Sequence, residues 1–197
     1  SGLQHLAAGV VFAAAATEIL PQVVHSGSPA ATLIGGGLAV VLMLTLKGAQ
    51  SEGKGPRALL VAIGLDILID GMVLGLAFLA GARAGFLLTV ALTMEVLFLG
   101  LTLTAELGEH YDSKRRVVGI VSGLALLLPL GTLLATPVAT LPPLVISGFL
   151  SFGLIALLYL VTEELLAEAH EKPDTLLIAS MFFVGFLGLL ALEELGG

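Results

Sequence analysis

The sequence contains no cysteine and no tryptophan, and few of its residues are charged. Without cysteine, the chain forms no disulfide and offers no thiolate to a metal ion. Charged residues make up 12% of the 197 residues and hydrophobic residues 57%, whereas a soluble domain is usually about 25% charged and about 45–50% apolar. These proportions, together with a mean hydropathy of +1.10, indicate an integral membrane protein.

Basic residues are also scarce, because the chain has 8 of them against 15 acidic residues, for a formal net charge of −7. This balance argues against nucleic acid as a partner. The sequence also lacks the patterns of several enzyme classes, since it has no HExxH helix, no serine in a Gly-x-Ser-Gly context and no glycine-rich phosphate loop. We therefore predict a membrane protein that is not an enzyme.

Apolar segments of about 20 residues, long enough to cross a hydrocarbon core of ~30 Å as a helix, occur seven times. The breaks between them carry glycine, proline and polar residues, as in "HSGSP" and "HEKPDT". Because backbone groups in lipid need internal hydrogen bonds, we expect helices. The chain is predicted to be an all-α polytopic transmembrane helix bundle that forms a single domain over 1–197. The expected helices are 3–24, 29–47, 57–81, 84–108, 116–136, 142–167 and 174–194.

The basic residues indicate how these segments cross the membrane. The second, fourth and sixth loops hold seven of the eight Lys and Arg residues, and only Arg83 lies in a loop on the other side. By the positive-inside rule, the loops rich in basic residues face the cytoplasm. We therefore expect the first helix to start inside, the C-terminus to lie outside, and the protein to reside in the cell (inner) membrane.

Three carboxylates, those of Asp66, Asp70 and Glu95, fall close to the midpoints of the third and fourth segments. A charged aspartate at the centre of a bilayer costs about 2.5–3.5 kcal/mol by insertion scales. Asp66 and Asp70 are four residues apart and share one helix face. Because the connection "GARAG" is short, the third and fourth helices are predicted to be antiparallel neighbours, and the three acids are expected to converge.

Such a cluster is either a buried, protonated group held by threonine and backbone partners, or a cation site. Three acids at one depth on adjacent helices favour the cation site. Oxygen ligands suit Mg²⁺, Mn²⁺, Fe²⁺ or Ca²⁺ and tolerate Zn²⁺, and the residues alone leave monovalent ions and protons open. Thr93 and Met94 are candidate further donors, and His5, beside Gln4, is a candidate lining residue of an exit route.

Several segments resemble, in order, the helices of the ZIP (Zrt/Irt-like) family of divalent-metal transporters. "DILIDG" (66–71) resembles the "HNFADG" of the family's metal-binding fourth helix, and "MEVLFLG" (94–100) stands where the fifth helix carries "HEIPEELG". "AAGVVFAAAATEILPQ" resembles the second helix, "LLLPLGTLLA" the sixth and "YLVTEELLAE" the seventh. The resemblance spans almost the whole chain and implies eight helices, of which the first has no counterpart here, with both termini outside.

The resemblance also implies a set of site residues. It places the metal-site histidine of the fourth helix on Asp66, the acid of that motif on Asp70, and the acid of the fifth helix on Glu95. It places the histidine of the second helix's "HLLPE" on Glu18, and the glutamate of the seventh helix's "VELLPE" on Glu164. Both histidines of the family's central site are absent here, so a carboxylate-rich site stands where the family has a binuclear one.

We therefore expect transport of a divalent cation, such as zinc, manganese or iron, toward the cytoplasm through the three central acids. Glu18 is expected on the outer route and Glu164 on the inner one. Two alternatives remain open from the residues. One is a proton- or Na⁺-coupled carrier of another solute on the same scaffold, and the other is a non-transporting membrane metal sensor or assembly protein. The family analogy implies a homodimer within the lipid bilayer.

Overall fold

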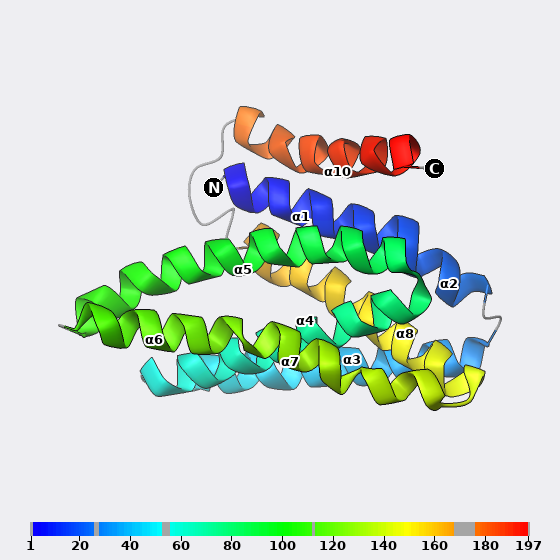
Figure 1. The fold of residues 1–197 in the computed structure, drawn as a ribbon, viewed down its shortest axis with the longest axis horizontal. Helices are drawn as coiled ribbons and strands as arrows, with labels where there is room; N and C mark the ends of the chain where they lie inside the picture. Colours follow the sequence, from blue (N-terminus) through cyan, green and yellow to red (C-terminus); the bar gives the residue numbers. More distant parts are fainter. Residues whose placement is uncertain (1, 26–27, 53–55, 112, 168–175, 197) are drawn as a thin grey trace.

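Helices account for almost all of the computed structural model (Figure 1). The structure describes residues 2–25, 28–52, 56–111, 113–167 and 176–196, and contains no strand within them. Seven helical spans among these residues are long and apolar enough to cross a membrane. The predicted all-α polytopic bundle is therefore confirmed, and the chain is an integral membrane protein.

Four spans are single helices, and three are built from consecutive pieces. The single helices are α3 (Pro29–Glu52), α4 (Pro56–Ala80), α5 (Ala82–His110) and α10 (Leu176–Gly196). The first span joins α1 (Gly2–Ala14), the π-helical turn η1 (Ala15–Ile19) and α2 (Leu20–His25). The fifth joins α6 (Lys114–Ala125), α7 (Leu127–Leu134) and the 3-10 helix η2 (Thr136–Thr140), and the sixth joins α8 (Pro143–Tyr159) and the π-helical turn η3 (Leu160–Leu165).

The predicted bounds agree closely with the structure except in the fifth span. The second span ends at Gly48, one residue from the predicted 47, although the helix α3 continues through polar residues to Glu52, because leaving the apolar run does not by itself break a helix. The fifth span is not continuous, since α6 ends at Ala125 and α7 begins at Leu127. Pro129 lacks the N–H that would bond to the carbonyl of Ala125, and this loss explains the break. Residues 174 and 175, predicted to start the seventh helix, lie outside the described residues.

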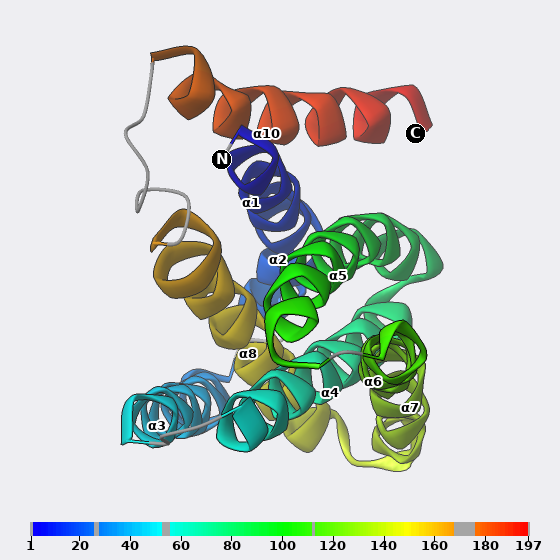
Figure 2. The same ribbon diagram turned by 90° about the vertical axis from the view of Figure 1, so that its left-hand side faces the viewer.

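The helix α4 lies in the middle of the bundle. It packs against α3, α5, α7, α8 and η1, and the view along the bundle shows α3 and α8 on one side of it and α6 and α7 on the other (Figure 2). The last helix, α10, lies at the edge and packs mainly on α1. The third span is therefore the helix with the most neighbours, and it is the helix that carries Asp66 and Asp70.

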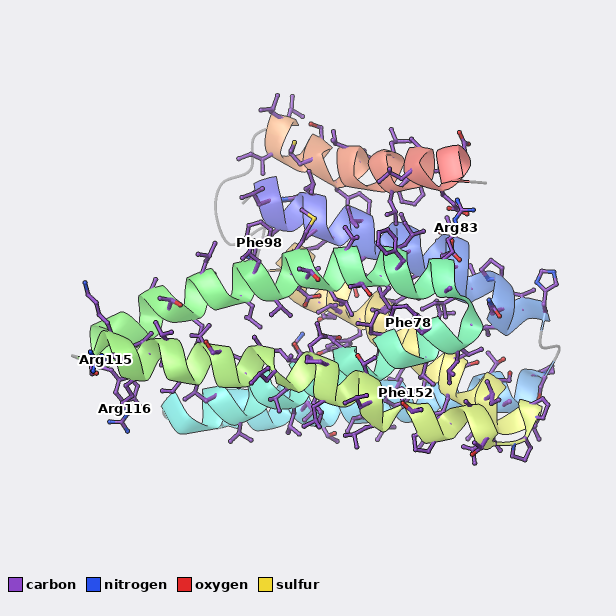
Figure 3. The ribbon with its side chains drawn as sticks, in the orientation of Figure 1. Phe78, Arg83, Phe98, Arg115, Arg116 and Phe152 are labelled. Carbon is purple, nitrogen blue, oxygen red and sulfur yellow. The ribbon has the colours of Figure 1, made fainter. Side chains whose placement is uncertain are left out.

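The first six spans alternate in direction along the bundle, so their ends gather at two ends of it (Figure 1), whereas α10 lies steeply across the others (Figure 2). At one end α3 and α5 finish and α4 and α6 begin (Figure 1). Lys114 is the first residue of α6, Lys47 lies near the end of α3, and Arg115 and Arg116 lie at this end (Figure 3). We name this the basic end. Arg83 lies at the opposite end, which we name the far end, well separated from Arg115 and Arg116 (Figure 3).

The α4 and α7 helices approach closely at a pair of glycines. A Cβ atom added at Gly71 would collide with the backbone carbonyl of Leu128, and one added at Gly131 would collide with that of Leu68. In lipid, small residues at such crossings let two backbones pack directly against each other. Because Gly71 follows Asp70 in sequence, this contact holds the central part of α4 in place.

Substitution of Gly131 by alanine is expected to lower the thermal stability of the purified protein. The added methyl group meets backbone rather than a flexible side chain, so α4 and α7 must separate, at a cost of about 1–3 kcal/mol. Gly123→Ala, in the same span, is the control, since a Cβ there meets nothing within 4 Å. Thermal unfolding of both variants in detergent tests this, and equal unfolding temperatures would contradict the proposed crossing.

Candidate cation site

Asp66, Asp70 and Glu95 meet between α4 and α5. One carboxylate oxygen from each residue lies within 4.8 Å of the other two. Asp70 is 5% exposed and Glu95 is 6% exposed, and Asp66 is half-buried. The structure therefore brings together the three acids that the helix spacing predicts. We name them the acidic triad.

The local sequence explains this convergence. Residues four apart on a helix lie on the same face, so Asp66 and Asp70 present their carboxylates to the same neighbour. The helices α4 and α5 are joined through Gly81, and this short connection makes them antiparallel neighbours. Glu95, near the middle of α5, therefore meets the middle of α4.

A cavity of about 70 Å³ adjoins the acidic triad, which is room for a few water molecules. Its polar lining residues are Gln4 of α1, Asp66 of α4, and Glu95 and Thr102 of α5. Its apolar lining residues are Phe98, Leu99, Leu160 and Leu165. Four spans thus surround the cavity. Of its four polar lining residues, Asp66 comes from α4, and the other three come from α1 and α5, which pack against each other.

The cavity extends from the acidic triad toward the basic end. Thr102 lies about two turns past Glu95 in the direction in which α5 runs to that end. Gln4 belongs to the first turn of α1, and Leu165 is the last residue of η3. On the other side of the triad, α4 and α5 are packed through buried apolar residues, which include Val73, Leu76, Leu88 and Leu92. The cavity therefore lies on the basic-end side of the triad, and packed apolar residues lie on its far-end side.

Thr93 and Met94, the further donors predicted from the sequence, are not among the residues that line the cavity. Thr93 is exposed and Met94 is half-buried. Helical spacing accounts for this, because a residue two positions from Glu95 lies about 200° around the helix. The structure therefore places Thr93 on the outer surface of α5.

Gln4 and Thr102 are polar lining residues that the sequence reasoning did not assign to the site. Thr102 follows Glu95 by seven residues, a spacing that keeps both on one helix face, so a search of that face would have found it. No comparable signal exists for Gln4, because its place beside the triad depends on how α1 packs against α5. His5 next to it is buried, at 2% exposed.

Glu18, expected on the outer route, lies apart from the acidic triad. Its Oε1 atom is 3.9 Å from Nε of Arg83, and the Arg83 guanidinium also donates to the backbone carbonyl of Glu193. Arg83 and Glu95 are 12 positions apart on α5, or about 18 Å along the helix axis. Arg83 therefore joins the first span to α10 at the far end.

Glu164, expected on the inner route, belongs to η3, but its side chain lies outside the part of the chain whose side chains are described. The neighbouring Glu163 pairs with Lys47 of α3, with 2.5 Å between Oε2 and Nζ. This pair lies on the basic-end half of the bundle, and both side chains are about half exposed, at 49% and 53%. Exposed ion pairs contribute little to stability, so the pair orients η3 against α3 rather than holding the fold.

Glu18 and Glu164 share an unexpected backbone setting, since both lie in π-helical turns. In η1, Thr17 Oγ1 donates to the carbonyl of Ala13 at 2.9 Å. In η3, Thr162 Oγ1 donates to the carbonyl of Leu158 at 2.9 Å. Single π-helical turns within α-helices are frequent at functional sites, and η3 itself lines the cavity.

The size of the acidic triad fits a single divalent ion. Two ligands of one ion lie no farther apart than twice the ion–oxygen distance, which is about 4.6–5.2 Å for Ca²⁺ and about 4.2 Å for Mg²⁺. The three carboxylate oxygens lie within 4.8 Å of one another, a separation that falls in the range for Ca²⁺. A small inward movement of the side chains would bring them to the separation that Mg²⁺ requires. With Gln4 and Thr102 nearby, the donors around the cavity are oxygen atoms, which hard cations prefer.

No protein-family model matches the chain, and no curated protein sequence matches it. The function of the site is therefore inferred from its geometry and its donor chemistry.

Asp70→Asn is expected to raise the unfolding temperature of the metal-free protein and to reduce the further rise that added Mn²⁺ or Ca²⁺ produces. Two charged carboxylates about 4–5 Å apart repel by about 3–4 kcal/mol at an effective dielectric constant of about 20, and a bound cation removes this repulsion. Thermal unfolding with chelator and with metal measures both effects. Glu194→Gln, at an exposed position of α10, removes the same charge elsewhere and should change neither. A full metal-induced shift in Asp70→Asn would exclude Asp70 from the site.

Proposed function

We propose that this protein transports divalent metal cations across the membrane on a ZIP-like helix bundle. The observation that carries the proposal is the acidic triad, in which three carboxylate oxygens lie within 4.8 Å of one another between the middles of α4 and α5. Intramembrane acids are costly to bury and are found mainly where ions or protons pass. A divalent cation offsets the cost of burying three of them at one point.

The asymmetric cavity supports a transport role. A storage or structural site needs no route to solvent, whereas here the lining residues run from the triad toward the basic end. By the positive-inside rule, we assign the basic end to the cytoplasm. The structure then corresponds to an inward-facing state, with the outward route closed by the apolar packing of α4 on α5 and by the Arg83 contacts with Glu18 and α10.

Transport requires a second state in which the closed side opens. In carriers of this kind, groups of helices rock around a site near the midplane, so that it faces one side at a time. The contacts of Arg83 would be broken in the outward-facing state, because they join the first span and α10 to the start of α5. Uptake toward the cytoplasm then proceeds from the Glu18 side past the triad and along Gln4 and Thr102.

The resemblance to the ZIP family supports the same function. The acidic triad falls on the two positions of "DILIDG" and the one of "MEVLFLG" that correspond to the family's metal ligands. The replacement of histidine by oxygen donors favours harder cations such as Mn²⁺, Fe²⁺ or Ca²⁺ over Zn²⁺. We also propose, from the family analogy, that the protein acts as a homodimer.

A second candidate function is a carrier in which protons or Na⁺ bind the acidic triad and drive another solute. This reading is favoured by the purely carboxylate nature of the triad, since carboxylates also bind protons and Na⁺. Under this alternative, the triad remains essential, but no divalent ion crosses the membrane.

Proteoliposomes containing the full chain are expected to take up Mn²⁺ or a related divalent ion. Asp70→Asn should lower the initial rate at least about tenfold, because it removes a charged ligand from the ion. Glu194→Gln should leave the rate unchanged. Uptake measured with a metal-sensitive dye inside the vesicles distinguishes the two candidate functions. If no divalent metal moves, while a proton or Na⁺ gradient is dissipated in a manner that requires Asp70, the second function is correct.

The neutral donors can be tested in the same assay. Gln4→Leu and Thr102→Val should each slow uptake by about twofold to tenfold, which corresponds to the net value of one polar contact, about 0.5–1.5 kcal/mol. Thr93→Val is the matched control, since Thr93 is exposed on another face of α5 and its loss should have no effect. A larger effect of Thr93→Val than of Thr102→Val would contradict the cavity described above.

A further inference from the structure

A groove lies between α5 and α6 at the basic end, on the far side of α5 from α1. Its volume is about 510 Å³. It is lined by Thr104, Gly108 and Tyr111 at the end of α5, and by Lys114, Val117 and Val118 at the start of α6. None of these residues belongs to the acidic triad or to its cavity, so the groove is a separate feature of the bundle.

The polarity of the groove changes along its length. Lys114 and Tyr111 lie where the two helices meet at the basic end, and Val117, Val118 and Gly108 lie about one turn farther toward the middle of the bundle. A ligand that fills the groove therefore meets a cation and a phenol at its outer end and two valines farther in, while the hydroxyl of the deeper Thr104 donates to the backbone carbonyl of Gly100. This is the polarity of a phospholipid, whose headgroup lies at the interface and whose chains point inward.

The positive charge at the outer end is concentrated. Lys114, Arg115 and Arg116 are consecutive and exposed, and the Arg116 guanidinium lies over the Tyr111 ring at 4.7 Å from its centroid. This stacking fixes the ring that forms one wall of the groove.

We propose that this groove binds an anionic phospholipid, with its phosphate at Lys114 and Tyr111 and its first acyl methylene groups against Val117 and Val118. Basic pockets between transmembrane helices at the membrane interface are suited to anionic lipid headgroups. The site is independent of the transport proposal, because it shares no residue with the cation route.

Native mass spectrometry of the full chain, purified with equal amounts of phosphatidylglycerol and phosphatidylcholine, tests this inference. The protein should retain phosphatidylglycerol in preference to phosphatidylcholine. Lys114→Gln should reduce that retention by about fivefold, the change expected for loss of one interfacial cation. Arg115→Gln removes the same charge from a neighbouring exposed residue that does not line the groove, and should have a clearly smaller effect.

A variant that keeps all the charges tests whether the groove itself, rather than general attraction to a basic surface, retains the anionic lipid. A Cβ atom at Gly108 meets nothing within 4 Å, so Gly108→Leu places a larger apolar side chain at the groove without a clash at its Cβ. It should reduce phosphatidylglycerol retention as strongly as Lys114→Gln. Equal retention of the two lipids, equal effects of Lys114→Gln and Arg115→Gln, or full retention by Gly108→Leu would each overturn the proposal.

Discussion

Mutual repulsion and desolvation of three carboxylates inside an apolar helix bundle are the constraint around which this structure is organised. The acids lie within 4.8 Å of one another, and two of them are almost fully buried. Burying acidic side chains inside a membrane costs free energy, so such a cluster is unusual unless it has a function. The helix that carries two of the acids, α4, packs against several other spans, and Asp70 is buried among them.

The surroundings of the acidic triad differ on its two sides, so the two ends of the bundle are not equivalent as routes to the triad. Toward the far end, large apolar side chains of α4 and α5 are buried against each other, and Arg83 contacts both η1 and α10. Toward the basic end, Gln4 and Thr102 line a small cavity instead. The π-helical turn η1 lies on the far-end side of the triad, and η3 lies on the basic-end side. Each turn contains a Thr-Glu pair, Thr17–Glu18 in η1 and Thr162–Glu163 in η3. Under the proposed transport function, this asymmetry corresponds to one of the two states that alternating access requires.

The outer surface has its own chemistry. Large apolar residues are exposed along α3, α6, α7 and α10, as expected for helices that face lipid. At the basic end this surface changes to Lys and Arg side chains, and there α5 and α6 separate enough to leave a groove. The charge distribution that orients a membrane protein is thus also the feature that would select among lipid headgroups.

The number of spans, their approximate limits and the convergence of Asp66, Asp70 and Glu95 were determined by the sequence itself, because hydropathy, helix periodicity and one short connection are local properties. The break in the fifth span is also local, since it follows from Pro129, although hydropathy alone did not reveal it. The other polar groups of the cavity were decided only by tertiary structure. Thr93 is close to Glu95 in sequence but lies on another helix face, whereas Gln4 is remote in sequence and is brought near by the packing of α1 on α5. The direction of the cavity and the groove at Lys114 also depend on which helices pack together, and contacts between distant segments leave no periodic signal in a single sequence.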